Sequence, residues 1–259
     1  MTLAALIFDV DGTLADTEEA HRQSFNAAFA THGLPWIWDA TAYAWLLRVP
    51  GGKERLRHFI AGLDLSPQMR QRLLGLVPDL HRTKTAAYAN CMASGAVPLS
   101  PWILRLLREA RAEGLRLAIA STTSPANIEA LFQGAMGAAP MDWFSVIAAG
   151  DDVARKKPAP DVYQLALAKL GLDAADCAAF EDSAIGVSAA KAAGLWTVAH
   201  PSPWTAQDDL SGADLVLDDA AASRLSLAAL RAHHGATFVP APALSWPSAA
   251  SRSPVKRPC

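Results

Sequence analysis

Residues 6–14, Leu-Ile-Phe-Asp-Val-Asp-Gly-Thr-Leu, decide the fold of this chain, because a short apolar run ends there in two carboxylates and a glycine. Residues i and i+2 of an extended chain point the same way, so Asp9 and Asp11 are expected to face one pocket at the end of a buried strand. Two like charges this close are unfavourable unless a cation or a shared proton offsets them. The pair therefore predicts a divalent metal at a strand's carboxyl end, where open α/β sheets bind ligands.

The composition is that of a globular protein with a large core. The chain has 259 residues, of which 51% are hydrophobic and 19% charged, enough for one large domain or two modest ones. A net charge of −2 and an isoelectric point of about 6.4 indicate neither a nucleic-acid partner nor a membrane-surface partner. We expect a monomer that acts on a small molecule.

The chain shows no sign of secretion or of a membrane span. The first charged side chain is Asp9, so no basic region precedes the first apolar stretch, as a signal peptide would require. No apolar run approaches the roughly 18 residues of a membrane span. The three cysteines, Cys91, Cys177 and Cys259, are far apart and odd in number, which fits reduced thiols and predicts a cytoplasmic protein.

Short apolar segments alternate with helical patterns along the chain. Strands are predicted at residues 4–8, 115–120, 144–148, 177–180, 195–198 and 214–217. Residues 101–112 carry Trp102, Ile103, Leu106, Leu107 and Ala110 at helical spacing, with Gly114 as the cap. This alternation predicts an α/β fold with a doubly wound, Rossmann-like parallel sheet.

The first strand is separated from the second by far more chain than a strand–helix–strand unit of about 30 residues needs. Residues 17–96 show helical patterns and no confident strand, which predicts a helical domain inserted after the first strand. Its first helix would carry His21, Phe25, Ala28 and Phe29, with Gly33 near its end. The core domain would comprise residues 1–16 and 97–234, and the Pro/Ala/Ser-rich residues 235–259 would form a disordered tail.

The two leading carboxylates suit phosphate-ester chemistry. Enzymes accelerate phosphate-monoester hydrolysis by up to ~10²¹-fold, which no single group supplies. Asp9 is placed to attack phosphorus as a nucleophile. Asp11 is placed to protonate the leaving oxygen and then to deprotonate water. The alternative is that Asp11-Gly12 is simply a turn.

Three further motifs follow predicted strands. Glu181-Asp182 offers oxygen ligands of the kind that Mg2+ prefers, together with Asp9 and a main-chain carbonyl near Asp11, although acidic residues also suit helix N-termini. Ser121 and the following hydroxyl residues can hold phosphate oxygens or act as an ordinary helix cap. A lysine of Lys156-Lys157-Pro158 can neutralise phosphate charge or be solvated. Each motif alone is ambiguous, but their joint occurrence after successive strands favours a site.

This ordered pattern resembles the haloacid dehalogenase superfamily of phosphotransferases, and the likeness covers about residues 3–220. The resemblance implies Mg2+, an aspartyl-phosphate intermediate and a helical cap over the site. It implies Asp9 as nucleophile, Asp11 as general acid/base and provider of a main-chain carbonyl to the metal, and Asp182 as a metal ligand. It also implies Glu181 as a ligand or neighbour of the metal, Ser121 as phosphate ligand and Lys157, chosen from the Lys-Pro-x-Pro-Asp run, as the charge-neutralising lysine.

Finer motifs look like the CbbY type within this family, which resembles β-phosphoglucomutase but dephosphorylates xylulose 1,5-bisphosphate. They are Asp16–His21, Gly51-Gly52-Lys53-Glu54-Arg55, His81-Arg82-Thr83-Lys84 and Thr122-Thr123-Ser124. By this resemblance the substrate contacts would be Glu18, His21, Gly52, Lys53, Arg55, Lys84, Ser121 and Thr122. The alternative for the cap cations is a solvated helix face. Arg48-Val49-Pro50 departs from the small hydroxyl residues expected before Gly51, and Arg48 would either contact phosphate or point to solvent.

The leading hypothesis is therefore a Mg2+-dependent sugar-phosphate phosphatase, and three alternatives stand beside it. A sugar-phosphate mutase would share the aspartyl-phosphate but pass it to a sugar hydroxyl. A non-catalytic binding protein on this scaffold would lack one of the essential groups, and all are present. A dehalogenase of this superfamily would not need the metal arrangement of Asp11 and Asp182, since the fold does not fix the function.

Overall fold

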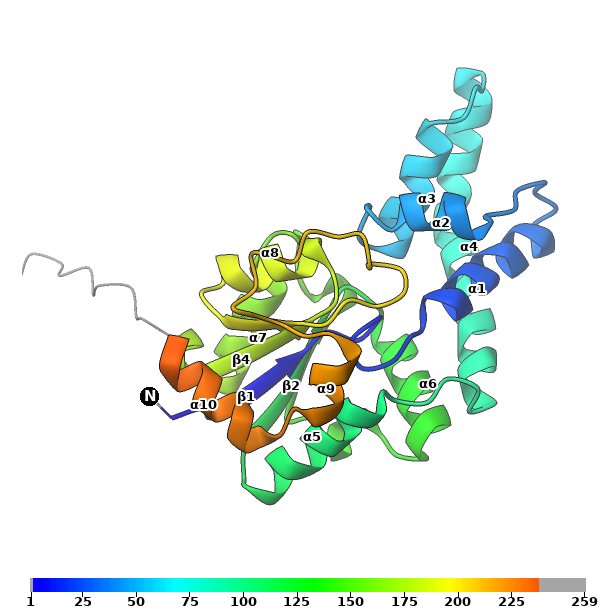
Figure 1. Cartoon of the computed structure of the whole chain (residues 1–259). Helices are drawn as coiled ribbons and strands as arrows, with labels where there is room; N and C mark the ends of the chain where they lie inside the picture. The colour runs from blue at the N-terminus through cyan, green and yellow to red at the C-terminus, as the bar shows by residue number, and fades with distance from the viewer. Residues whose placement is uncertain (1, 238–259) are drawn as a thin grey trace, which may run out of the picture.

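The computed structural model describes residues 2–237 and is built on a six-stranded, all-parallel sheet with the order β3-β2-β1-β4-β5-β6 (Figure 1). The strands are β1 (Ala5–Phe8), β2 (Arg116–Ser121), β3 (Val146–Ala149), β4 (Cys177–Glu181), β5 (Trp196–Ala199) and β6 (Leu215–Val216). The helices are α1 (Glu18–Thr31), α2 (Ala40–Leu46), α3 (Gly52–Ala61), α4 (Pro67–Ala93), α5 (Pro101–Ala112), α6 (Pro125–Met136), α7 (Asp161–Leu170), α8 (Ala184–Ala192), α9 (Asp219–Arg224) and α10 (Leu227–Thr237), with short 3-10 turns at Pro140–Asp142, Gly150–Asp152 and Ala174–Asp176. The predicted doubly wound α/β sheet is confirmed.

The strands are apolar throughout because helices cover both faces of the sheet. In β1, Leu6 and Phe8 join a cluster with α5, α6 and α10, whereas Ala5 and Ile7 join a second cluster with α7 and α8. Successive side chains of a strand point to opposite faces, so the two clusters interleave along each strand. The small alanines on the second face leave room for α7 and α8 to lie close to the sheet.

The predicted elements lie within two residues of the observed ones. The helix predicted over 101–112 coincides with α5, and Gly114 follows it with a φ of 75°. The strand predicted from 144 begins at Val146 instead, because the backbone N–H of Phe144 donates to the carbonyl of Pro140 and closes a turn there. Phe144 is nevertheless fully buried, which explains why its apolar side chain suggested a strand.

Residues 17–96, which we call the helical insertion, contain α1 to α4, and these helices stand over the carboxyl end of the sheet in Figure 1. The insertion has an apolar cluster of its own, in which Phe25 and Phe29 of α1 pack around Trp38. Its α4 runs along α6, so closely that a Cβ on Gly134 would lie 1.8 Å from the Met92 carbonyl oxygen. The division into two domains remains a prediction.

The C-terminal boundary differs from the prediction at its start. The helix α10 continues to Thr237, so the first residues of the predicted tail are helical. Residues 238–259, with Cys259, lie outside the described part of the chain. Among residues 2–237, no helix combines the length and the apolar character needed to cross a membrane.

Candidate active site

The topology of the sheet sets the position of the site. From β1 the chain builds outward through β2 and β3 on one side, and β4, β5 and β6 then add on the other side. The crevice at such a switch point opens between β1 and β4, at their carboxyl ends. Asp9 follows β1, Ser121 ends β2, and Glu181 ends β4. The backbone N–H of Asp9 donates to the Phe180 carbonyl at 3.0 Å, which holds these strand ends level.

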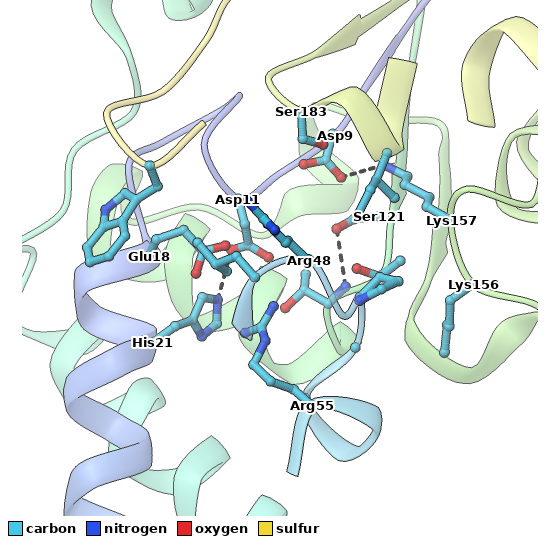
Figure 2. Close-up of a pocket in the computed structure, with 18 of the residues that line it drawn as sticks. Asp9, Asp11, Glu18, His21, Arg48, Arg55, Ser121, Lys156, Lys157 and Ser183 are labelled. Carbon is cyan, nitrogen blue, oxygen red and sulfur yellow. Dashed lines mark hydrogen bonds and ion pairs between the residues drawn. The ribbon is translucent and has the colours of Figure 1, made fainter. Parts of the chain in front are cut away.

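A pocket of about 620 Å³ lies between these strand ends and the helical insertion (Figure 2). All the side chains predicted from the sequence line it: Asp9, Asp11, Glu18, His21, Gly52, Lys53, Arg55, Lys84, Ser121, Thr122, Lys157, Glu181 and Asp182. They come from segments as far apart as residues 9 and 182, so the fold brings together what the sequence keeps separate. Their individual roles remain proposals.

Lys157 joins the two strand-end carboxylates. Its Nζ lies 2.7 Å from Asp9 Oδ1 and 2.6 Å from Glu181 Oε1, and its side chain is only 6% exposed. Tyr163 of α7 also donates to Glu181 Oε1, at 2.5 Å. Burial would lower the pKa of Lys157, but the charges of Asp9 and Glu181 outweigh it and raise that pKa above its usual value. Lys157 therefore stays an ammonium beside Asp9, and Glu181 accepts hydrogen bonds on both oxygens, since its Oε2 accepts the backbone N–H of Asp182 at 3.3 Å.

Three carboxylates around this lysine leave negative charge uncompensated. Oxygens of Asp9, Glu181 and Asp182 lie within 4.8 Å of one another, and all three residues are buried. Burial raises the pKa of Asp9 to about 7, despite Lys157. Burial and the charges of Asp9 and Glu181 also raise the pKa of Asp182 well above its usual value. An all-oxygen donor set with one cation for three carboxylates fits a divalent ion of the Mg2+ kind.

Gly12 allows Asp182 to reach this cluster. Gly12 has a φ of 85°, and a Cβ built on it would lie 2.1 Å from Asp182 Oδ2. The glycine of the Asp-x-Asp-Gly motif is thus required twice, for its left-handed backbone and for the close approach of a carboxylate. Thr205 donates to the same Oδ2 at 3.1 Å and helps to fix the carboxylate.

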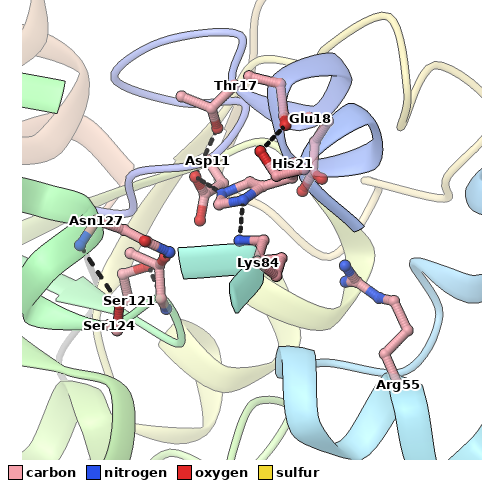
Figure 3. A network of polar contacts seen from close by, with 12 residues as sticks. Asp11, Thr17, Glu18, His21, Arg55, Lys84, Ser121, Ser124 and Asn127 are labelled. Carbon is pink, nitrogen blue, oxygen red and sulfur yellow. Dashed lines mark hydrogen bonds and ion pairs between the residues drawn. The ribbon is translucent and has the colours of Figure 1, made fainter. Parts of the chain in front are cut away.

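Asp11 belongs to a second network, which reaches into the helical insertion (Figure 3). Its Oδ1 accepts hydrogen bonds from Thr17 Oγ1 at 2.5 Å and from His21 Nε2 at 2.9 Å. Lys84 Nζ contacts the other ring nitrogen of His21, so an ammonium at Lys84 requires Nδ1 to accept and Nε2 to carry the proton. Oδ2 is the oxygen of Asp11 left for reacting groups.

The pKa values of Asp11 and Lys84 both lie below their usual values, which favours the charged form of the carboxylate and the neutral form of the amine. Burial acts to raise the pKa of Asp11, but the electrostatic interaction with His21 and the hydrogen bonds from His21 and Thr17 outweigh it, and the pKa lies below its usual value. Burial lowers the pKa of Lys84 to about 7, although Asp11 opposes the shift. Lys84 also lies over the rings of Phe25 and Tyr88, at 5.3 and 4.9 Å.

Ser121 lies at the floor of the pocket and is 1% exposed. Its Oγ accepts the backbone N–H of Thr123 at 3.2 Å, which folds the following loop back over the strand end. Ser124 then caps α6, accepting the N–H of Asn127. Hydroxyl groups and backbone N–H groups at a helix start suit phosphate oxygens. Thr122 is half-buried on the same loop.

The insertion brings both acidic and basic groups to the pocket. Arg55 is buried, with Nη1 3.0 Å from the Tyr43 hydroxyl and Nε 3.2 Å from the Leu46 carbonyl oxygen. The Tyr43 hydroxyl donates to Glu18 at 2.7 Å. Gly51 caps α3 with a φ of 89°, so Gly52 and Lys53 begin a helix instead of forming a loop. Arg48 is exposed and projects into the same pocket (Figure 2).

Four residues that organise the site were not singled out from the sequence: Thr17, Tyr163, Trp204 and Thr205. Thr17 and Thr205 hold the carboxylates Asp11 and Asp182, Tyr163 holds Glu181, and Trp204 lines the pocket. Thr17 begins the helix after the first motif, a position that offered some signal. The other three had no local signal, because their partners lie 18 or more residues away.

Comparison with known proteins shows the family of this chain. Residues 3–194 match the haloacid dehalogenase-like hydrolase family. Protein CbbY of Rhodobacter capsulatus is 51% identical over 223 residues, covering 86% of this chain and 96% of that protein. The plasmid-borne Protein CbbY of Cupriavidus necator is 48% identical over 256 residues, covering 92% and 100%.

A solved structure gives the same relationship in three dimensions. CbbY from Rhodobacter sphaeroides in complex with phosphate aligns with a TM-score of 0.82 and 43% identity, over 88% of this chain and 99% of that one. A mutant of the same protein has been solved with xylulose 1,5-bisphosphate. β-Phosphoglucomutase of Clostridium difficile, at 20% identity and a TM-score of 0.70, shares the fold.

These relationships confirm the predicted family and the predicted enzyme class, a phosphatase, and they agree with the acidic motifs at the ends of β1 and β4. The match to the family covers most of the chain, and the CbbY relatives align over nearly their whole length. The chain belongs to the haloacid dehalogenase-like hydrolase family, among its CbbY-type members.

Proposed function

We propose that this protein is a Mg2+-dependent sugar-phosphate phosphatase that acts through an aspartyl-phosphate and takes xylulose 1,5-bisphosphate or a similar sugar bisphosphate. The observation that carries the proposal is the pocket itself, in which Asp9 and Asp11 from one strand end face basic residues of the helical insertion. The complex of the Rhodobacter sphaeroides relative with xylulose 1,5-bisphosphate supports the substrate.

In the first half-reaction an oxygen of Asp9 attacks phosphorus, and the bond from phosphorus to the sugar oxygen breaks. Asp11 gives a proton to that leaving oxygen. A phosphate dianion beside Asp11 raises its pKa by like-charge repulsion, which favours the proton-donating form while substrate is bound. In the second half-reaction water attacks phosphorus, Asp11 takes its proton, and the bond to Asp9 breaks to restore the free carboxylate.

The remaining groups bind and orient the phosphoryl group. Ser121 and the backbone after it would hold phosphate oxygens, and Lys157 would neutralise their charge beside Asp9. Asp9, Asp182 and the main-chain carbonyl of Asp11 would hold Mg2+, with Glu181 as their neighbour. When bound, the ion supplies positive charge to the phosphoryl oxygens and lowers their repulsion of the nucleophile.

A bisphosphate needs a second cationic region away from the metal. Lys53 and Arg55 line the pocket from α3, and Arg48 projects into it from the end of α2. Glu18 and His21, on α1, line the pocket near Asp11, and we assign them to the sugar part of the substrate. Lys84 lies against His21, so we assign it to orienting that ring and through it the substrate.

The test is phosphate release from a panel of sugar mono- and bisphosphates, including ribulose and xylulose bisphosphates, with and without Mg2+. Asp9→Asn should lose essentially all turnover while remaining folded, whereas Asp79→Asn, at an exposed pair on α4, should match the wild type. Retained activity in Asp9→Asn would remove Asp9 from its role. Isomerised sugar phosphate in place of free phosphate would instead indicate a mutase.

We also propose a cytoplasmic location and a monomeric state for the protein. Cys91 and Cys177 are free thiols, which supports the cytoplasmic location. Sedimentation of the purified protein measures the oligomeric state.

A further inference from the structure

The segment between β5 and β6, residues 200–214, crosses from the sheet toward the helical insertion (Figure 1, gold). Its turn is fixed by hydrogen bonds between two hydroxyl residues. The backbone N–H of Thr205 donates to the Ser202 carbonyl at 3.1 Å, and the N–H of Ser202 donates to Thr205 Oγ1 at 2.9 Å. This turn presents two adjacent side chains to different partners, Trp204 to Tyr43 of the helical insertion and Thr205 to Asp182 after β4.

Thr205 anchors the turn to the catalytic end of the sheet. Its Oγ1 donates to Asp182 Oδ2 at 3.1 Å. Trp204 reaches the other way, and its ring meets that of Tyr43 edge-on, with centroids 5.5 Å apart and planes at 89°. A half-buried indole of the core segment thus joins the apolar cluster of the helical insertion.

Trp204 itself lines the pocket, and Tyr43 links its ring to two further pocket residues. Tyr43 is fully buried, donates from its hydroxyl to Glu18 at 2.7 Å and accepts from Arg55 at 3.0 Å. Both partners line the pocket. A displacement of the Tyr43 ring would therefore move an acidic and a basic side chain together.

The contact is separate from two further attachments of the insertion. One is the packing of α4 along α6, with Gly134 against the backbone at Met92, and the other is the hydrogen bond between His21 of α1 and Asp11. The Trp204–Tyr43 pair adds a contact at α2, so it helps to define how closely this part of the insertion approaches the sheet.

We propose that Trp204 is a positioning residue, which holds the helical insertion in its observed position over the sheet and acts through Tyr43 on Glu18 and Arg55. The identity of the substrate that Trp204 helps to position rests on the proposed function. Edge-to-face aromatic pairs are favourable and directional, so the ring fixes both distance and orientation.

The experiment compares Trp204→Ala and Trp204→Phe with Trp36→Ala, a matched tryptophan that packs in the same insertion cluster against Phe29 and Phe59. Amide hydrogen exchange of residues 40–46 is measured first, because it needs no substrate. The kcat/KM is then measured for xylulose 1,5-bisphosphate and for p-nitrophenyl phosphate, which has no sugar or second phosphate to orient.

Trp204→Ala should speed amide exchange in residues 40–46. It should lower kcat/KM for the bisphosphate about three- to tenfold, which is the effect of losing one aromatic pair. The kcat/KM for p-nitrophenyl phosphate should stay within about twofold of the wild-type value. Trp204→Phe should recover most of the loss. In a Tyr43→Phe background, which lacks the hydroxyl, Trp204→Ala should cost less. Trp36→Ala should leave the ratio of the kcat/KM values for the two substrates unchanged.

Unchanged exchange in residues 40–46 of Trp204→Ala would overturn the proposal, as would equal losses on both substrates or full additivity with Tyr43→Phe. Failure of the proposed function is distinguishable from this. If the wild type does not hydrolyse the bisphosphate while exchange still responds to Trp204→Ala, the positioning role stands and the substrate is wrong.

Discussion

Gly12→Ala should damage the site by two separable effects. A residue with a side chain at a φ of 85° is strained by roughly 1–2 kcal/mol. For a chain of this size that lowers Tm by about 2–8 °C. The new Cβ would also lie 2.1 Å from Asp182 Oδ2, so the carboxylate must move. A displacement of about 1 Å at a catalytic group can cost around 100-fold in rate.

The control is Gly33→Ala, because Gly33 has a φ of 65° and a Cβ added there would meet nothing within 4 Å. Both variants should lose similar thermal stability by circular dichroism. Only Gly12→Ala should lose about 100-fold in phosphate release from p-nitrophenyl phosphate. Equal activities in the two variants would refute the reasoning, since the close approach of Asp182 would then be unimportant.

Three further predictions concern charge. Lys157→Met should lower the free energy of unfolding by about 3–5 kcal/mol in urea titrations without metal, because Asp9 and Glu181 lose their buried cation. The control is Lys191→Met, at a partly exposed ion pair, which should lower the free energy of unfolding by under about 1 kcal/mol. The pKa of Lys84 is about 7 in the folded state and 10.5 ordinarily, so the unfolded chain binds more protons between these values. Wild-type stability should therefore rise with pH from 7 to 9 relative to Lys84→Met, by at most about 1.4 kcal/mol per pH unit, and a constant difference would contradict this. Mg2+ at about 100 times its Kd should raise the free energy of unfolding by about 2.7 kcal/mol, and melts that do not differ with and without EDTA would argue against the metal site.

Much of the fold was predictable because its signals are local. The apolar runs at β1 and β4 and the periodicity of α5 depend only on neighbouring residues. The boundaries of β3 could not be predicted in this way, because the turn that Phe144 closes with Pro140 competes with the strand. Residues 235–237 of the predicted tail belong to α10, since alanine and glycine near its end resemble the tail that follows.

The candidate site was also predictable only in part. Asp9 and Asp11 could be identified from their spacing, and Lys157 and Asp182 from their positions after strands. The partners that set their charge states could not be identified from the sequence, because Lys84 and His21 are 63 residues apart and Tyr163 and Glu181 are 18 residues apart. Neither pair has a periodic or motif relationship that a sequence alone displays.

The sequence by itself determined which groups could meet: an apolar strand that delivers two carboxylates to one side, and three more motifs at the ends of later strands. The tertiary structure decided how those groups share charge, which oxygen of Asp11 is left for reacting groups, and how the helical insertion meets the sheet at Trp204. The reason is physical. Strand and helix patterns follow from adjacent residues, whereas burial, ion pairing and ring contacts depend on distances that exist only once remote segments are packed together.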